Sequence, residues 1–226
     1  MTDSARRRLY LMRHAQVRYF QGRHPHEVQL TEVGHTQAEA AAAALREVRF
    51  DRVITSGLPR TLETARIVAP DQEAERDEAL REIESGDIRK LDPGVVQQMM
   101  TAAFRGNVPL DTKFLGGETV GALLDRVLPA LDALLADQSW DVSLLVLHGG
   151  VNRAILSRAA TGERTFLGGF EQSPGCINIL DVDAEGAFVV RTVNHTPYDP
   201  AHVGAPRLTT MEQLWREYLD SRDRSP

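Results

Sequence analysis

Three short apolar runs along the chain share one pattern. RRLYLM (7–12), FDRVIT (50–55) and DVSLLVL (141–147) are rich in β-forming residues, and each continues through a turn into a stretch of helical character. Their apolar residues are contiguous rather than alternating, which is typical of strands covered on both faces. The pattern predicts three strands of a parallel sheet.

The helices between these strands have recognisable starts. An alanine-rich helix is predicted over 30–48 with Thr31 as its N-cap, because a threonine side chain accepts a hydrogen bond from an early backbone amide. Pro59 stands where the next helix begins, a position that tolerates proline. Leucines and valines at helical spacing predict a further helix over 117–138, in which we expect Pro129 to cause a kink.

The rest of the chain predicts a hairpin and two further helical regions. Residues 175–193 indicate a β-hairpin that turns at 184–186, and a final helix near 209–220 is expected to end in a frayed tail at 221–226. We interpret 92–116 as a small helical excursion over the edge of the sheet and a candidate lid. Together these elements predict an α/β fold in one domain over 1–226: a three-layer sandwich with a mostly parallel central sheet flanked by helices.

Composition adds mainly exclusions. The chain has 226 residues, of which 42% are hydrophobic and 26% charged, and this suits one globular core. Its formal charge of -6 disfavours a nucleic-acid partner, because such proteins need a positive field along one face. The single cysteine, Cys176, excludes an internal disulfide and suits a reducing compartment. No apolar run is long enough for a signal peptide or a membrane span, so we expect a cytoplasmic protein with no membrane partner, and we leave a homodimer open.

Cations and histidines follow all three predicted strands. Arg13 and His14 follow the first, Ser56 to Arg60 the second, and His148 with two glycines the third. Ligands of an open parallel sheet bind beyond the carboxyl ends of its strands, so we expect these side chains at one rim. A phosphate fits them best, because arginine donates paired hydrogen bonds to phosphate oxygens and helix N-termini add backbone amides. A histidine among such cations is expected to stay neutral and nucleophilic near pH 7.

Six segments then resemble the histidine phosphatase superfamily, the phosphoglycerate-mutase-like group. Their order along the chain is that of the family, and the resemblance runs from residue 9 to about 194, which is most of the chain. The segments are RHA (13–15), LTEVG (30–34), SGLPRTLETA (56–65), LREIESG (80–86), GGET (116–119) and VLHGGVNRAI (146–155). Each motif alone is weak, but the complete series is specific.

The resemblance implies a role for each matched residue. His14 is expected to attack phosphorus and form a phosphohistidine. Arg13, Arg60 and His148 are expected to hold the phosphoryl oxygens in the transition state. Glu82 is expected to protonate the leaving alkoxide and then to activate water. The arginines neutralise the charge, so the resemblance implies neither a metal nor another cofactor.

Further residues are expected to contact the substrate. They are Ser56 and Gly149, which lie in matched segments, and Gly22 and Arg23, which lie in the loop after the nucleophile. A phosphorylated small molecule is the expected partner. His24 and His26 have a spacing that suits a metal, but no further ligand set follows them, so a surface loop is the preferred interpretation.

Several positions depart from the family pattern. Ala15 replaces the glycine after the nucleophile, Phe20 stands where mutase-type members carry asparagine, and residues 88–89 replace a tryptophan and a glutamate. Glu84 and Asp87 lie close to Glu82 in sequence, so they remain alternatives for the general acid. The absence of the asparagine at position 20 favours a metal-independent phosphomonoesterase acting on a small phosphorylated metabolite. A phosphoglycerate-mutase-type phosphotransferase and a non-catalytic phospho-ligand binder remain alternatives.

Overall fold

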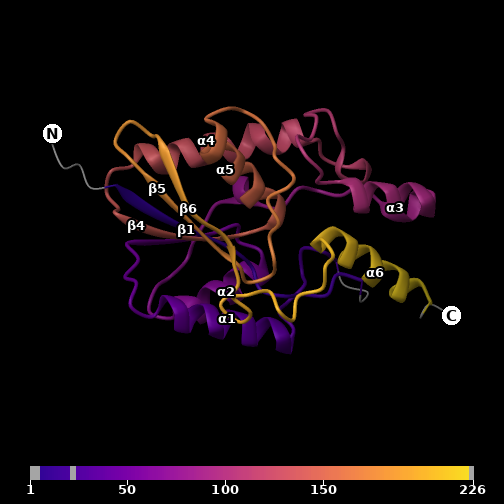
Figure 1. Cartoon of the computed structure of the whole chain (residues 1–226), viewed down its shortest axis with the longest axis horizontal. Helices are drawn as coiled ribbons and strands as arrows, with labels where there is room; N and C mark the ends of the chain where they lie inside the picture. The colour runs from indigo at the N-terminus through magenta and orange to yellow at the C-terminus, as the bar shows by residue number, and fades with distance from the viewer. Residues whose placement is uncertain (1–5, 21–23, 224–226) are drawn as a thin grey trace.

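A central sheet with helices on both faces forms the body of the molecule (Figure 1). The structure is a computed structural model that describes residues 6–20 and 24–223. Helices α4 (Val120–Ala136) and α5 (Gly149–Thr161) cover one face of the sheet, and α1 (Glu32–Leu45) and α2 (Pro59–Val68) cover the other. The predicted α/β sandwich is confirmed.

The sheet has six strands in the order β3-β2-β4-β1-β5-β6. The first four strands are parallel where they pair, whereas β5 pairs antiparallel with both β1 and β6. The strands are β1 Arg7–Arg13, β2 Arg52–Thr55, β3 Glu75–Arg76, β4 Val142–Leu147, β5 Ile177–Val182 and β6 Phe188–His195. The last two form the predicted hairpin. The short β3 was not predicted, because both of its residues are charged and exposed.

Alternate residues of the buried strands pack on opposite faces. In β1, Leu9 and Leu11 belong to the core under α4 and α5, whereas Tyr10 and Met12 belong to the core under α1 and α2. Both faces of the strand are therefore apolar. This explains why the central strands appear in the sequence as unbroken apolar runs.

The predicted starts of the helices agree with the structure better than their predicted lengths do. Thr31 caps α1, and its hydroxyl accepts from the Gly34 amide at 3.0 Å; Pro59 is the first residue of α2. The helix predicted over 117–138 begins only at Val120, because Thr119 is its N-cap, and it continues through Pro129. No helix of the described residues is both long and apolar enough to cross a membrane.

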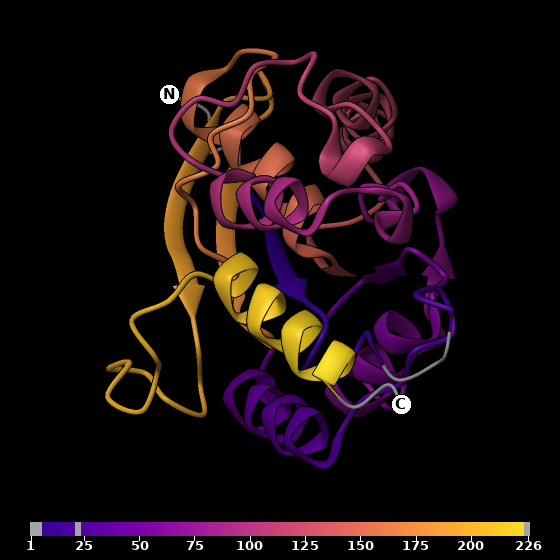
Figure 2. The ribbon, with the colours of Figure 1, turned by 90° about the vertical axis from the view of Figure 1, so that its right-hand side faces the viewer.

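Two helices lie beyond the carboxyl ends of the parallel strands (Figure 2). They are α3 (Pro93–Ala102), inside the predicted excursion 92–116, and α6 (Thr210–Asp223). Apolar residues including Met100 of α3 and Tyr218 of α6 pack together in a third buried cluster. The excursion therefore packs against the C-terminal helix rather than over the sheet edge, and much of 103–113 has no helix.

The end of α6 corrects the predicted tail. We expected residues 221–226 to fray, but the helix continues to Asp223, and residues 224–226 lie outside the described part of the chain. Tyr218 is buried, and its carbonyl oxygen accepts a 2.7 Å hydrogen bond from the Ser221 hydroxyl. This anchoring near the end of the helix extends it beyond the predicted boundary at 220.

Gly34 allows α1 to approach the loop that follows β1. A Cβ atom at this position would lie 2.3 Å from the carbonyl oxygen of Gln16. We expect Gly34→Ala to lower the free energy of unfolding by about 1–3 kcal/mol, as overpacking does, measured by urea denaturation. Gly169→Ala is the matched control, because its added Cβ would have no atom within 4 Å. Equal stability of the two variants would contradict the close approach.

Candidate active site

Three neighbouring strands bring the predicted residues to one end of the sheet. Arg13, the last residue of β1, pairs with Leu147, the last residue of β4. Thr55, at the end of β2, pairs with Val146 of β4. The residues that directly follow the three strands therefore emerge side by side, as the sequence predicted.

His14 is buried and has one ring nitrogen free for chemistry. Its Nδ1 lies 2.8 Å from the carbonyl oxygen of Ala15, so we assign the proton to Nδ1 as the donor. Nε2 then keeps its lone pair, with the Tyr19 hydroxyl 3.4 Å away. Burial and the positive charges of Arg60 and Arg13 hold the pKa of His14 well below its ordinary value. The imidazole is therefore neutral near pH 7 and suited to act as a nucleophile.

His148 faces His14, with the two ring centroids 5.3 Å apart. Its Nε2 lies 2.7 Å from the Ser56 hydroxyl, and its buried Nδ1 has no partner. Burial and the charge of Arg60 hold the pKa of His148 well below its ordinary value too. We expected Ser56 to contact substrate. In the structure its buried hydroxyl contacts Nε2 of His148 and lies 3.2 Å from the Thr61 hydroxyl. Ser56 therefore orients the second histidine.

Unpartnered nitrogens mark the place for an anion. Within residues 6–20 and 24–223, four buried side-chain nitrogens lack a hydrogen-bond partner, and three of them belong to Arg13, Arg60 and His148. Buried polar groups almost always have partners, so this concentration is unusual. Each guanidinium is held through another nitrogen: Arg13 donates to the Gln172 carbonyl at 2.6 Å, and Arg60 to the Pro25 carbonyl at 2.9 Å. The arginines are thus fixed while their Nε–H groups remain available.

Glu82 lies at the same rim, at the start of α5. The backbone amide of Gly150 lies 3.1 Å from each of its carboxylate oxygens. A Cβ at Gly149 would lie 3.7 Å from both Arg13 Nε and Glu82 Oε2, so the bare backbone leaves space between cation and carboxylate. A Cβ at Gly150 would lie 2.5 Å from Glu82 Oε1. The two glycines therefore admit the carboxylate and leave room for a ligand.

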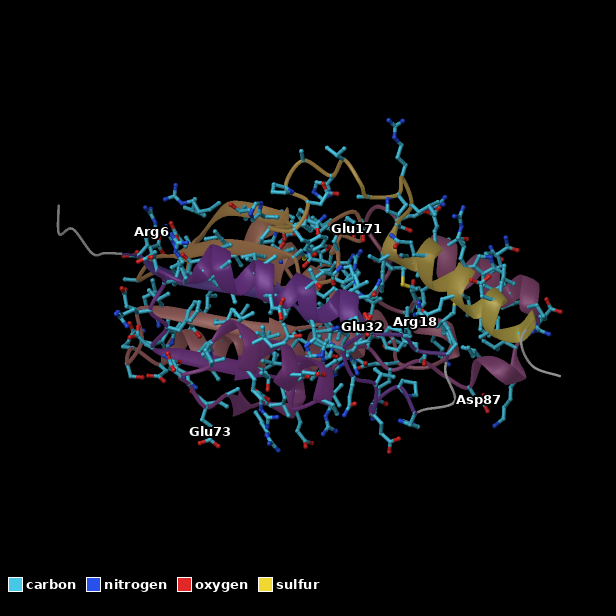
Figure 3. All side chains as sticks on the ribbon, turned by 90° about the horizontal axis from the view of Figure 1, so that it is seen from below. Arg6, Arg18, Glu32, Glu73, Asp87 and Glu171 are labelled. Carbon is cyan, nitrogen blue, oxygen red and sulfur yellow. The ribbon has the colours of Figure 1, made fainter. Side chains whose placement is uncertain are left out.

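The alternative acids have other surroundings. Glu84 and Asp87 are exposed, and Figure 3 shows Asp87 at the outer edge of the molecule. The Asp87 carboxylate lies 3.7 Å from the Lys90 ammonium. Of the three candidates, Glu82 is the one that contacts the start of α5, and this favours it for the acid.

A partly buried ion pair supports the segment that carries Glu82. Arg126 of α4 donates to the carbonyl oxygens of Ala79, Arg81 and Glu82 at 2.6–3.1 Å. Its charge is balanced by Glu118 at 2.8 Å. Glu118 belongs to the GGET segment, so that motif supports the backbone segment that carries Glu82. Sequence reasoning missed Arg126, although an arginine on the apolar helix α4 was a usable signal.

Two other predicted features have mixed outcomes. Gly22 and Arg23 lie outside the described residues. His24 and His26 lie with ring centroids 4.9 Å apart, and His24 is exposed, as expected for a surface loop. Among the residues that the structure describes, no three metal-ligating side chains gather into a group around them or elsewhere.

Sequence reasoning also missed Arg153 of α5. It is 2% exposed and lines the cavity at this rim, where its Nη2 lies 3.4 Å from Glu171. The cavity has a volume of about 1,770 Å³ and extends from Arg13 and His14 to α6. Figure 3 shows Glu171 beside the start of that helix. An arginine inside an otherwise buried helix was the available signal.

Comparison with known proteins now decides the family. The sequence model of the histidine phosphatase superfamily (branch 1) matches residues 9–196. The chain belongs to this superfamily. The matched region includes most of β1, the strand ends and the hairpin, so the rim described above lies within the part of the chain that matches the family.

Individual relatives include phosphatases and a mutase-like protein. An acid phosphatase of Mycobacterium tuberculosis (strain ATCC 25618 / H37Rv) is 32% identical over 160 residues, covering 67% of this chain and 74% of that protein. Phosphoglycerate mutase-like protein 4 of Arabidopsis thaliana is 32% identical over 146 residues, 61% of this chain, and the match spans 63% of that protein's length. The solved structure of the alpha-ribazole phosphatase from Shigella flexneri shares the fold, with a TM-score of 0.65 at 22% identity over 83% of this chain and 96% of that chain.

The two buried histidines, His14 and His148, predict that the stability of the protein depends on pH. Their pKa values lie below the ordinary value of 6.5, so the unfolded chain takes up protons below pH 6.5 that the folded chain excludes. The contribution of the two histidines to the free energy of unfolding is therefore complete above pH 6.5. Below pH 6.5 it falls by up to about 1.4 kcal/mol per pH unit for each histidine. Urea denaturation without phosphate between pH 7.5 and 5.5 measures this slope. The slope should be smaller in His148→Gln than in the wild type, and equal slopes in the two proteins would contradict the prediction.

Proposed function

We propose that the protein is a phosphomonoesterase that hydrolyses a small phosphorylated metabolite through a phosphohistidine at His14. One observation carries the proposal: a buried, neutral imidazole with a free Nε2 lies beside buried donor groups of Arg13, Arg60 and His148 that have no partner. A phosphoryl group is tetrahedral and anionic, and it would use all of these donors at once.

The first half of the reaction transfers the phosphoryl group to the enzyme. His14 Nε2 forms a bond to phosphorus while the ester P–O bond breaks, and Glu82 gives its proton to the departing alcohol oxygen. Negative charge on the phosphoryl oxygens is held by Arg13, Arg60 and His148. Each donor of this kind is worth about 3–4 kcal/mol of barrier lowering in a water-excluded site.

The second half regenerates the enzyme. Glu82, now a carboxylate, takes a proton from water as the water oxygen bonds to phosphorus. The N–P bond breaks, inorganic phosphate leaves, and Nε2 regains its lone pair. The guanidinium groups supply the positive charge throughout, so we propose that the reaction requires no metal and no other cofactor.

The mutase alternative differs only in the acceptor of the phosphoryl group. In place of the asparagine of mutase-type members, this chain has Phe20, whose ring packs against Tyr218 of α6 with centroids 5.4 Å apart. The ring gives that position an apolar contact instead of a polar group. Together with the name of the acid phosphatase relative, this supports water as the acceptor.

Release of phosphate from a panel of phosphomonoesters tests the proposal. We expect the purified protein to release inorganic phosphate in the presence of chelator and to carry acid-labile phosphate on His14 after a rapid quench. His14→Ala should lower turnover at least about 10⁴-fold, because the nucleophile is lost. His195→Ala, at an exposed histidine of β6, is the control that should remain active.

The other outcomes of this experiment separate the alternatives. Isomerised product without phosphate release would show a mutase. Tight binding of phosphate esters with no turnover, equal in wild type and His14→Ala, would show a non-catalytic binder. Activity lost in chelator and restored by a metal ion would contradict the metal-independent mechanism.

The acid role of Glu82 predicts a dependence on the leaving group. We expect Glu82→Gln to lower kcat for alkyl phosphates by about 10²–10⁴-fold, because the departing alkoxide then lacks a proton donor. The loss should be much smaller for p-nitrophenyl phosphate, whose leaving group needs no proton. Glu84→Gln, at the neighbouring exposed carboxylate, is the matched control. A larger loss in Glu84→Gln would reassign the acid.

A further inference from the structure

Tyr19 lies at the nucleophile, yet none of the matched motifs includes it. Its hydroxyl is 3.4 Å from Nε2 of His14, the atom that would bond to phosphorus. Its ring lies beneath the guanidinium of Arg60, with the carbon of that group 5.8 Å from the ring centroid. The side chain therefore touches two members of the phosphate site.

This hydroxyl would change its hydrogen-bond acceptor when a phosphoryl group binds. Because Nδ1 of His14 donates to Ala15, Nε2 can only accept, so the Tyr19 hydroxyl donates to it. A phosphorus atom that bonds to Nε2 displaces this hydrogen bond and brings phosphoryl oxygens to the same place. The hydroxyl can then donate to one of these oxygens while keeping its proton.

The backbone of Tyr19 is held by a carboxylate from the other end of the chain. Glu217 of α6 accepts from the Tyr19 amide at 2.8 Å. The Glu217 side chain is partly buried, and this burial raises the pKa of its carboxyl group. The neighbouring Phe20 ring packs on Tyr218 of the same helix. The loop that aims Tyr19 is thus fastened to α6 by a polar contact and an apolar contact.

The helix itself is anchored next to the site. The amide of Thr210, at its first residue, lies 3.2 Å from a carboxylate oxygen of Glu171, and the other oxygen of Glu171 pairs with buried Arg153. Thr209 and Glu212 bond to each other's backbone amides, which closes the first turn. Glu217 therefore projects from a fixed helix. Figure 3 shows Arg18, the residue before Tyr19, close to α6.

We propose that Tyr19 is a further catalytic residue, which donates a hydrogen bond to the transferring phosphoryl group, and that Glu217 is a positioning residue acting through Tyr19. The proposal rests on the proposed phosphatase function. It adds a neutral donor to the two arginines and the second histidine, and it gives the C-terminal helix a part in the reaction.

Removal of the hydroxyl tests the catalytic role. We expect Tyr19→Phe to lower kcat about 10–100-fold with little change in KM, because one hydrogen bond to a charged group is lost in the transition state. The rate of phosphohistidine formation in a rapid-quench single turnover should fall by the same factor. Tyr10→Phe removes a hydroxyl from a buried tyrosine of β1 that packs against Phe50, and it should leave both rates unchanged.

A double-mutant cycle tests the positioning role. Glu217→Ala should lower kcat severalfold in the wild type and have no further effect in Tyr19→Phe, because its influence passes through the lost hydroxyl. Glu217→Gln, which keeps an acceptor oxygen for the Tyr19 amide, should restore most of kcat. If Glu217 merely stabilises α6, its loss would lower kcat equally in both backgrounds, and the positioning role would be wrong.

The outcomes separate this inference from the function on which it rests. A wild type that releases no phosphate overturns the proposed function and the inference together. An active wild type whose kcat is within twofold of that of Tyr19→Phe overturns the inference alone. A change confined to KM also overturns it, because such a change reports ground-state binding rather than a contact made during transfer.

Discussion

The rest of the site depends on two guanidinium groups that have a buried Nε atom and no carboxylate partner. Within the described residues, neither Arg13 nor Arg60 forms an ion pair, and each is held through a neutral carbonyl oxygen. Uncompensated buried charge is costly to the folded protein, and it is tolerated where a ligand of opposite charge supplies the compensation. Burial and the same charges keep His14 and His148 neutral, so in the proposed reaction one arrangement would both attract the phosphate and leave a lone pair to attack it.

Two arginines that support the site, one buried and one partly buried, show the contrast. Arg126 and Arg153 also donate to backbone carbonyl groups, but each has a carboxylate within reach, Glu118 and Glu171 respectively. Their charge is satisfied inside the protein, so they brace the segments around the site. An arginine paired with a carboxylate thus supports the fold, whereas an arginine held only by a carbonyl oxygen is suited to bind an anion. Sequence motifs alone do not carry this distinction, because it depends on which residues the fold brings next to each guanidinium.

The sequence predicted what depends on local pattern. Contiguous apolar runs gave the central strands, and the ordered motifs gave the residues at their ends. It did not predict β3, whose residues are charged, or the packing of 92–116 on α6, which depends on contacts between distant apolar residues. Ser56 lies at the predicted rim, but the sequence did not predict the contact of its hydroxyl with His148, which is 92 positions away along the chain. The sequence did not indicate Tyr19, because the contact of its hydroxyl with Nε2 of His14 depends on how the fold orients the two side chains.

The site divides into two parts that rest on different packing. The phosphate end follows strands whose side chains belong to the two cores on either face of the sheet. The far wall of the cavity is built by α3 and α6, which pack mainly on each other in a third cluster, and Phe104 and Phe114 touch both this cluster and a sheet core. A phosphate group would occupy only a small part of a cavity of about 1,770 Å³, so in the proposed reaction the wall made by the two helices would face the alcohol part of the ester. Under that proposal, changes in the wall would alter which ester is accepted without disturbing the phosphate contacts. The contact of Glu217 with the Tyr19 loop is where the two parts meet.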